Sequence, residues 1–562
     1  MTHWLLDLDV DGNVYRLSDV DLDVVAVDGT VLHYAAGVEV APVTESLSLL
    51  SPSATQPEAQ LVLYLPEVSA FGFLRARGEL ARWTEGTTYE TRRRVVTGAL
   101  QTPQIDHPQA GVAATLAQDA WTDPEMITGA SLVVSTDTWA HTSTLLDGAL
   151  GLAYPLVIGH PGRTSSGGVS GQAALRVDQR LAPTIGADFT NVSLLLAGHH
   201  VSATRVTLCT DTDPSGIIAH VANVYDAAGQ PVAVCPWFWS SDAVPLSLDY
   251  DGAATYAFTG GVGEVGIGSS SIDPSYNQDD TQPTVYASWQ DTIDATSGGL
   301  SVDGVLLREA GGVLDYILAL SGALVDHARM AEAKRALAPF LIDAVIAERV
   351  SPWDWVTQAL LPILPCSLAG GADGVFIVPL LLDLDESAAE ARLDTRRPDV
   401  VRSSPLGWDT SQLVRSVTVR YAYSVRKSTY TASVVYGSQA AATADASGVT
   451  RAHPTLTTAA AWGLSGEDLV IETGVVYEDQ TADLAADTLA RVRGLPIGTV
   501  TFDVPESDDQ FRGLERGAPV YCYDADTGID RMGQVRDVVT AGDGSLAILV
   551  WFILNPLRDV LA

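Results

Sequence analysis

Hydrophobic and polar residues alternate over most of the first hundred positions, which is the period of a half-buried β-strand. The runs "WLLDLDV", "QLVLYLPEV" and "YETRRRVVTGAL" lie in this region, and turn-forming residues separate them. Residues 1–103 are therefore predicted to form an N-terminal β domain. Further strands, separated by loops rich in Gly, Ser and Pro, continue over 104–262 and predict a β-rich insertion, either a sandwich or a barrel.

The hydrophobic period changes from strand to helix after residue 300. A polar, loop-like segment over 263–300 precedes the stretch "GGVLDYILALSGALVDHARMAEAKRAL", in which apolar residues recur at helical spacing. Residues 263–382 are therefore predicted to form a central α+β domain.

Strand alternation returns beyond the central domain, over residues 412–437. It places Val417, Val419, Tyr421 and Tyr423 on one face of a strand, and Ser416, Thr418 and Arg420 on the other. One helix, about Thr481 to Arg493, is expected to end at Gly494, because glycine commonly follows a helix C-terminus. Residues 383–562 are predicted to form a C-terminal β domain with one helix. The whole chain is thus expected to be mainly β and multidomain, with β-barrel or sandwich domains around one central α+β domain.

The stretch "SPWDWVTQALLPILPCSLAGG", residues 351–371, combines two tryptophans, three prolines and a run of leucines. Ser351 stands at an N-cap position, Pro352 at the first helical position and Asp354 three residues after the cap, which predicts a short helix start. The two later prolines interrupt the helix, so the segment is too short and too broken to span a bilayer.

Four apolar side chains of this stretch are predicted to lie in the core of the central domain: Trp353, Trp355, Leu360 and Leu361. Two tryptophans two positions apart cannot share one helical face. One of them is therefore expected to pack inward while the other covers a neighbouring element.

The composition indicates a large globular chain that carries strong negative charge. Its 562 residues are 47% hydrophobic and 18% charged, and the formal net charge is -37. This acidity argues against wrapping nucleic acid, because phosphate binding needs clustered Lys and Arg. It is compatible with a channel that lets DNA pass, since carboxylates repel the phosphate backbone. Neither a signal peptide nor an apolar run of membrane-spanning length is found, so synthesis in the cytoplasm is expected.

The segment "DLDVDGN", from Asp7 to Asn13, matches the first half of a calcium-binding loop. Ser18 occupies the twelfth position, where such a loop carries a bidentate Glu. Asp-Gly between alternating strands is also a strong hairpin signal. A β-hairpin is the favoured interpretation, and a weak surface calcium site at Asp7 to Asp11 is the alternative.

Other candidate motifs have ordinary structural explanations. "GVGEVG", Gly261 to Gly266, lacks the helix that a dinucleotide-binding loop needs, and His199 and His200 show no metal-ligand spacing. The cysteines stand far apart without a CxxC pair, so buried free thiols are expected; they are Cys209, Cys235, Cys366 and Cys522. No catalytic constellation is found, and a non-enzymatic protein without cofactor or metal is predicted.

Two groups of residues allow a chemical and a structural interpretation. Trp237 and Trp239 in "CPWFWSSD" could form an aromatic platform for sugar, although alternate tryptophans on a strand more often form one face of a core. Asp383, Asp385 and Glu386 resemble a strand end and a helix start more than an acid/base pair.

The local charge reverses between Arg392 and Lys427, where eight basic residues stand against three aspartates. This stretch is either a docking stripe for a partner or a set of solvated strand faces whose basic residues pair with acidic neighbours. The sequence does not distinguish the two.

Several passages, taken in order, resemble the tail hub proteins of long-tailed bacteriophages and related gene transfer agents. They are "YPLVIGHPGR" from Tyr154, "LLLAGHHV" from Leu194, "GGVLDYILALSGALVD" from Gly311, "SPWDWVTQALLPILPCSLAGGADGVFIVP" from Ser351 and "LVRSVTVRYAYS" from Leu413. None of them is diagnostic alone, and their order over most of the chain carries the resemblance.

The resemblance implies two tube-like β domains, here 1–103 and 383–562, that pair within each subunit around the hub domain of 263–382. Three subunits then give a ring of six similar domains that continues the tail tube. The expected protein is a homotrimer in the virion tail, with an axial channel for DNA and tape-measure protein. It would contact the distal tail protein and tube above and fibre or tip proteins below, and the insertion at 104–262 departs from an idealised hub.

Two alternatives from other functional classes remain open at this level. A carbohydrate-binding adhesion protein would use Trp237 and Trp239, and a polysaccharide hydrolase would use dispersed carboxylates among the 69 acidic residues.

Overall fold

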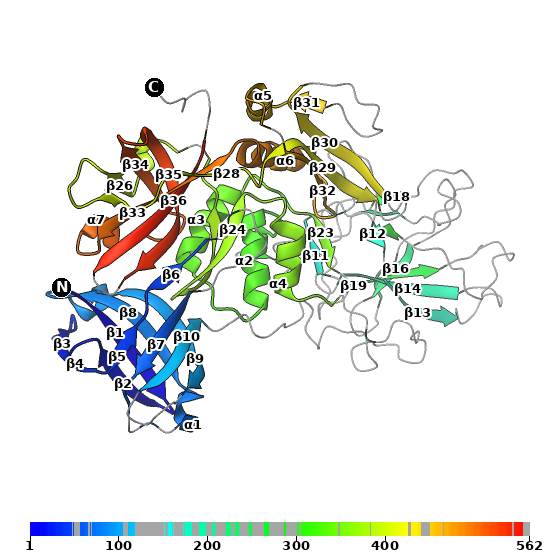
Figure 1. Ribbon diagram of the computed structural model, residues 1–562. Helices are drawn as coiled ribbons and strands as arrows, with labels where there is room; N and C mark the ends of the chain where they lie inside the picture. The colour runs from blue at the N-terminus through cyan, green and yellow to red at the C-terminus, as the bar shows by residue number, and fades with distance from the viewer. Residues whose placement is uncertain are drawn as a thin grey trace.

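The computed structural model describes the terminal and central regions of the chain and short strands between them (Figure 1). The residues described are 1–47, 49, 57–65, 68, 70–104, 111–118, 151, 156–159, 161, 172–173, 175–181, 190–197, 205–207, 221–225, 231–234, 247–249, 263–268, 286–287, 301–302, 305–346, 349–382, 384–424, 429–439, 450–464, 466–541 and 544–554. The mainly β, multidomain fold predicted from the sequence is confirmed.

The N-terminal domain is a strongly curved, mainly antiparallel sheet around its own apolar core. Alternate residues of its strands point inward, among them Trp4, Leu6, Leu80 and Leu116. Its elements are β1 (Thr2–Val10), β2 (Asn13–Ser18), β3 (Leu22–Val25), β4 (Val31–Ala36), β5 (Val38–Val40), β6 (Val43–Glu45), β7 (Glu58–Leu63), α1 (Ala70–Phe73), β8 (Arg77–Thr84), η1 (Tyr89–Thr91), β9 (Arg93–Gln104) and β10 (Val112–Gln118).

The turn between β1 and β2 is the hairpin that the sequence favoured. Val10 pairs with Asn13, and both turn residues have positive φ, 53° for Asp11 and 87° for Gly12. This is the conformation that a two-residue type I′ turn requires, and it explains the Asp-Gly pair. The Asp9 carboxylate accepts a hydrogen bond from the Gly12 N–H at 2.8 Å, so it serves the turn. Among the described residues, no group of three or more His, Cys, Asp or Glu side chains is arranged to hold a metal.

The region between the N-terminal domain and the central body contains short strands, five of which form one sheet in the order β13-β14-β19-β16-β17. The glycine-rich motif enters β19 at Gly263, so its described part is a strand, as expected, and begins no helix. The strands are β11 (Leu156–Ile158), β12 (Gln172–Ala173), β13 (Leu175–Leu181), β14 (Thr190–Ala197), β15 (Arg205–Thr207), β16 (Val221–Tyr225), β17 (Pro231–Val234), β18 (Ser247–Asp249), β19 (Gly263–Gly268), β20 (Tyr286–Ala287), β21 (Ser301–Val302) and β22 (Val305–Leu306).

A central body of helices and small sheets follows (green to yellow in Figure 1). Its first part holds α2 (Ala310–Leu320), α3 (His327–Leu337), β23 (Ala344–Ile346), α4 (Pro352–Trp355), the π-helix η5 (Val356–Leu360), β24 (Cys366–Gly371) and β25 (Gly374–Pro379). Its second part holds β29 (Val414–Ser424), β30 (Thr429–Gly437), β31 (Thr450–Ala452), α5 (Pro454–Ala461), β32 (Glu467–Glu472) and α6 (Asp479–Arg493).

These two parts share one hydrophobic core, so the predicted boundary at residue 383 does not separate the cores. Val417, Val419 and Tyr421 on β29 are buried against the helices, as their alternation predicted, while Arg420 on the other face is half-exposed. The strand pattern reveals which residues turn inward, but it does not reveal which part of the chain they meet.

Helix α6 ends at Gly494 as predicted, for a different reason. Gly494 has φ of -80°, which any residue can adopt, so left-handed geometry does not require glycine there. A Cβ at Gly494 would lie 2.4 Å from the Ala490 carbonyl oxygen and 3.0 Å from Leu456 on α5, so close packing requires glycine at this position.

The expectation of one helix after residue 383 was wrong, because α5 and α7 are also present. The α5 sequence "PTLTTAAA" is short, and its three threonines have low helix propensity, so the sequence gives only a weak helix signal.

The C-terminal domain is a second curved sheet around a separate core that includes Phe502, Phe511 and Ile548. Strands β34, β35, β36 and β33 run antiparallel in that order, and β26 to β28 lie on the edges. The elements are η6 (Glu386–Ala388), β26 (Ala391–Asp394), β27 (Val401–Arg402), β28 (Gly407–Asp409), β33 (Ile497–Pro505), α7 (Asp509–Arg512), β34 (Pro519–Asp524), β35 (Ile529–Thr540) and β36 (Ser545–Ile553).

Candidate functional site: the junction of the terminal β domains

Strand β6 joins the sheets of the N-terminal and C-terminal domains. Within the N-terminal domain it pairs with β7, through Thr44 opposite Glu58. It also pairs antiparallel with β35 of the C-terminal domain, where Val43 lies opposite Thr540. One three-residue strand thus continues both sheets, and Figure 1 shows the two domains (blue and red) next to each other.

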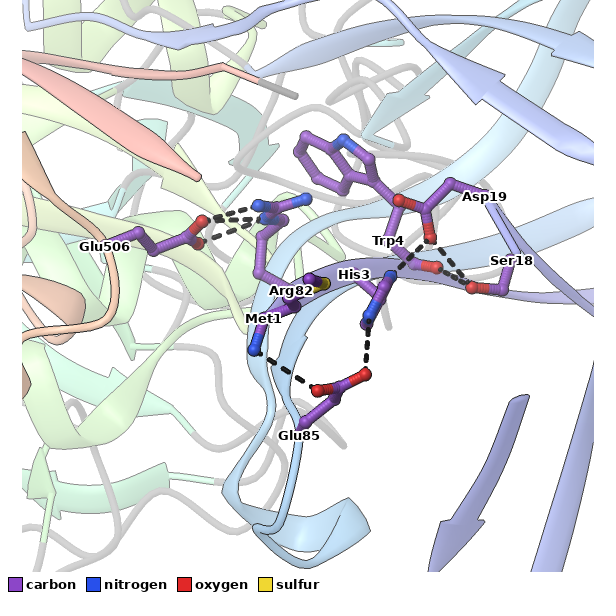
Figure 2. A network of polar contacts seen from close by, with 8 residues as sticks. All are labelled: Met1, His3, Trp4, Ser18, Asp19, Arg82, Glu85 and Glu506. Carbon is purple, nitrogen blue, oxygen red and sulfur yellow. Dashed lines mark hydrogen bonds and ion pairs between the residues drawn. The ribbon is translucent and has the colours of Figure 1, made fainter. Parts of the chain in front are cut away.

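A buried ion pair crosses the same junction. The Arg82 side chain on β8 donates to both carboxylate oxygens of Glu506, which follows β33, with N to O distances of 3.1, 3.0 and 2.6 Å. The two side chains are 1% and 0% exposed. Figure 2 shows the guanidinium facing Glu506, and its Cζ lies 4.5 Å from the centre of the Trp4 ring. Because a buried charge without its partner is costly, the pair favours one docking of the two domains.

Two more arginines reinforce the junction with contacts to side chains and backbone. Arg93 on β9 pairs with Glu45 on β6, and it donates to the Thr540 hydroxyl on β35 at 3.1 Å. Arg516 of the C-terminal domain donates to the Ser46 carbonyl at 3.0 Å and also to the Gly370 carbonyl of the central body. Arg516 therefore connects three regions of the molecule, and its burial lowers the pKa of its guanidinium.

A polar network surrounds the start of β1 beside this junction (Figure 2). The buried His3 ring lies 3.3 Å from Asp19 through Nδ1 and 3.3 Å from Glu85 through Nε2. Ser18 donates to the Trp4 carbonyl at 2.7 Å and so ties β2 to the same place. The hydrogen bond from His3 is the main cause of the lowered pKa of Glu85. The network fixes β1 in the position from which Trp4 packs on Arg82.

The junction offers geometry suited to holding domains together and shows no catalytic arrangement. Its arginines and glutamates are paired, Arg82 with Glu506 across the two domains and Arg93 with Glu45 beside the β6–β35 strand pairing. The chemical capacity of this site is therefore rigid association of two β domains. In the part of the chain that the structure describes, no helix is long and apolar enough to cross a membrane.

The residues predicted for the central core fall into two groups. Leu360 and Leu361 are buried members of the central core, at 0% and 7% exposure. Trp353 and Trp355 are only partly buried and pack against the edge of that core. Ser351 caps the helix by accepting from the Asp354 N–H at 2.9 Å, as the sequence predicted.

Several sequence candidates lie outside the described residues: Trp237, Trp239, His199, His200, Cys209, Cys235 and Asp383. Asp385 caps η6 by accepting from the Ser387 N–H at 3.0 Å, which confirms the interpretation as a helix start. Cys366 and Cys522 are buried free thiols, as expected. Burial raises the pKa of Cys366 to about 12, which leaves the thiol protonated and unreactive at neutral pH.

The basic stretch from Arg392 to Lys427 pairs with acidic neighbours. Each of its six described arginines forms an ion pair, and four of the pairs involve the exposed or half-exposed Arg392, Arg396, Arg415 and Arg420. The other two are made by Arg397 and Arg402. The described part of the stretch therefore consists of strand faces and loops with paired charges, and it does not support the docking-stripe interpretation.

Sequence reasoning missed the residues of the junction. Arg82 and Glu506 are separated by 424 positions, so no local spacing relates them. The available signal was weak: Arg82 interrupts a run of buried residues in β8, where a charged side chain needs a partner.

No protein-family model and no curated protein matches this chain. Three solved structures that align with it are phage tail proteins. The tail protein from Neisseria meningitidis has a TM-score of 0.37 and 10% identity, over 98% of this chain and 97% of that protein. The 43 kDa tail protein of prophage MuSo2 from Shewanella oneidensis has a TM-score of 0.33 and 11% identity, over 99% of each chain. The prophage tail protein gp18 from Listeria monocytogenes has a TM-score of 0.22 and 13% identity, over 38% of this chain and 55% of that protein.

Proposed function

We propose that this chain is a structural protein of a phage tail and serves as the trimeric hub at the distal end of the tail tube. The observation that carries the proposal is the junction, where β6 and the Arg82–Glu506 pair hold two curved β domains side by side in one chain. The sequence resemblance to tail hub proteins implies such a pair. Three copies would then present six β domains around one axis, and a closed ring leaves no sheet edge unpaired.

The net charge of -37 supports the second part of the proposal, an axial channel for DNA. A channel wall rich in carboxylates repels phosphates, so DNA and tape-measure protein pass without adhering. The distal tail protein and tube would bind one side of the ring and fibre or tip proteins the other.

Electron microscopy of the purified full-length protein at high concentration tests this function. Three-fold rings with an open centre are expected, and rings of another symmetry or with a closed centre would contradict the hub. Glu506→Ala is expected to abolish the rings because the two β domains lose their fixed relation. Asp468→Asn, which alters an exposed pair, is the matched control and should assemble normally.

A further inference from the structure

The His3 side chain is enclosed at the end of the N-terminal domain that docks on the C-terminal domain, with an exposed fraction of 10%. Its neighbours in β1, Thr2 and Trp4, have side chains on the opposite face of the strand. Trp4 packs on Arg82 of the buried ion pair. Thr2 lies beside the C-terminal domain, because a Cβ at Gly544 would be 3.4 Å from its hydroxyl oxygen. His3 therefore stands behind the part of β1 that meets the C-terminal domain.

Both ring nitrogens of His3 face a carboxylate (Figure 2). Nδ1 lies 3.3 Å from Oδ1 of Asp19, which directly follows β2, and Nε2 lies 3.3 Å from Oε1 of Glu85, which directly follows β8. These two contacts of the ring are called the His3 bridge below. The bridge connects β1 to the ends of the two strands that pair with it.

The charge on the His3 ring decides whether both contacts are hydrogen bonds. Neutral imidazole has one N–H, so its other nitrogen presents a lone pair to a carboxylate oxygen. Imidazolium has an N–H on both nitrogens and can donate to Asp19 and Glu85 at once. Hydrogen bonds between ionised groups are also roughly twice as strong as neutral ones. The bridge is therefore complete only when His3 is protonated.

Few other cations neutralise the two carboxylates. Among the described residues, neither Asp19 nor Glu85 pairs with an arginine or lysine, and the Met1 amino group, 3.4 Å from Glu85, is the one further cation in contact. Deprotonation of His3 leaves Asp19 facing an uncharged ring. The loss of the proton therefore weakens the connection between β1 and β2 most directly.

We propose that His3 makes the docking of the two terminal β domains sensitive to pH. The protonated ring fixes β1 between its neighbouring strands, and it thereby holds Trp4 against the Arg82–Glu506 pair on the other face of β1. The neutral ring gives up half of the bridge, and the junction opens more readily. This pH response does not depend on the proposed tail role.

The His3 bridge is expected to be strongest at mildly acid pH. Because the folded state favours the imidazolium, the stabilisation is present below the ordinary titration of histidine, at about pH 6.5, and is lost as the pH rises through it. At the acid end the bridge fails once the carboxylates take up protons. The hydrogen bond from His3 lowers the pKa of Glu85 from its ordinary value of 4.5, so this carboxylate stays ionised at about pH 5.5.

Amide hydrogen exchange of the full-length protein, measured by mass spectrometry at about pH 5.5 and about pH 8.5, tests the proposal. The reporting amides lie in the β6–β35 pairing, residues 43–45 and 538–540. His3→Gln keeps a polar side chain that cannot be charged. It should speed exchange of these amides roughly tenfold over wild type at the lower pH and leave it unchanged at the higher pH. Comparison with wild type at the same pH cancels the intrinsic pH dependence of exchange.

His33→Gln is the matched control for this measurement. His33 belongs to the same domain, but its side chain is 69% exposed and contacts one carboxylate, that of Asp23, at 2.8 Å. Its substitution should leave exchange at the junction unchanged at both pH values. Amides of α2 in the central body should not respond to either variant. Equal acceleration by His3→Gln at both pH values would mean that His3 acts only through packing, and no acceleration at the lower pH would mean that the junction holds without it; either result refutes the proposal.

Glu85→Gln tests the same bridge at a side chain that is 56% exposed, so this variant should fold even if His3→Gln does not. It should speed exchange at the junction at about pH 5.5 and have little effect at about pH 8.5. In this background His3→Gln should add less than it does in wild type, because the two residues share one contact. Acceleration by Glu85→Gln that is the same at both pH values, or full additivity of the two substitutions, would contradict the bridge.

Discussion

The domain junction and the outer face of the four-stranded sheet both join arginines to carboxylates, in opposite surroundings. At the junction, Arg82 and Glu506 are 1% and 0% exposed. On the sheet, Arg415 and Asp468 are 66% and 46% exposed and lie 3.0 Å apart through Nε and Oδ1. The chemical groups are equivalent, and only the burial differs.

The difference shows what each kind of pair does for the protein. An exposed pair competes with water and contributes roughly 0.2 to 1 kcal/mol, so it mainly keeps the surface solvated. A buried pair loses its hydration and is tolerated only when both partners are in register. The junction pair therefore acts on specificity: any other docking of the two β domains would bury an unpaired charge. The sheet pairs impose no such restriction.

The largest effect is expected from Glu506→Ala at the junction. The substitution leaves Arg82 buried without its partner, which should lower the free energy of unfolding by about 3 to 5 kcal/mol. Chemical denaturation of the full chain, followed by tryptophan fluorescence, measures this change. A loss below about 1 kcal/mol would put this pair in the same class as the exposed ones.

A double variant sharpens the same test. Arg82→Met with Glu506→Leu replaces both charges with apolar side chains, so stability should recover, since apolar replacements of buried pairs are often neutral or stabilising. If the pair specifies the docking of the domains, ring assembly should remain impaired although stability recovers.

The second largest loss of stability is expected in the apolar core of the central body, where no charged pair is involved. Leu360→Ala should destabilise by about 2 to 5 kcal/mol, because the side chain is fully buried and leaves a cavity. Trp353→Ala should cost less than the about 3 to 5 kcal/mol expected for a buried tryptophan, since its ring is partly exposed. Thermal unfolding of both variants checks this order, and the reverse order would place Trp353 at the centre of the core.

Local pattern predicted the elements of this fold better than it predicted their partners. The alternation of Val417, Val419 and Tyr421 identified the buried face of β29, and the Ser351 cap identified a helix start, because each depends on neighbours in sequence. That buried face packs on α6 and α5 and belongs to one core with residues before 383, and hydrophobicity does not encode which apolar surface another will meet.

The junction escaped prediction for a related reason. Arg82 lies in an ordinary strand pattern and Glu506 follows another, and each looks like one of many charged residues in a chain with 101 of them, 32 basic and 69 acidic. Their function as a pair arises only when two domains dock and water is excluded. Gly494 is an intermediate case: its position was predicted, whereas the approach of α5 that makes glycine necessary was not.

The smallest effect on stability is expected from Asp468→Asn on the exposed sheet face, and this effect should depend on pH and salt. Arg415 and then Ser416 lower the pKa of Asp468 from its ordinary value of 3.8. The stabilisation is therefore present above that value and is lost as the pH falls through the lower folded pKa. At pH 7 the variant should lose at most about 1 kcal/mol, because the pair is solvated.

That small difference between wild type and Asp468→Asn should vanish in about 1 M salt, where the screening length falls to about 3 Å. The cost of Glu506→Ala should persist in the same salt, because ions do not reach a buried pair. Denaturation of both variants with urea, at low and high salt, measures the two responses. Equal salt sensitivity would mean that the junction pair is hydrated in solution, and the two regions would then differ in geometry but not in energetics.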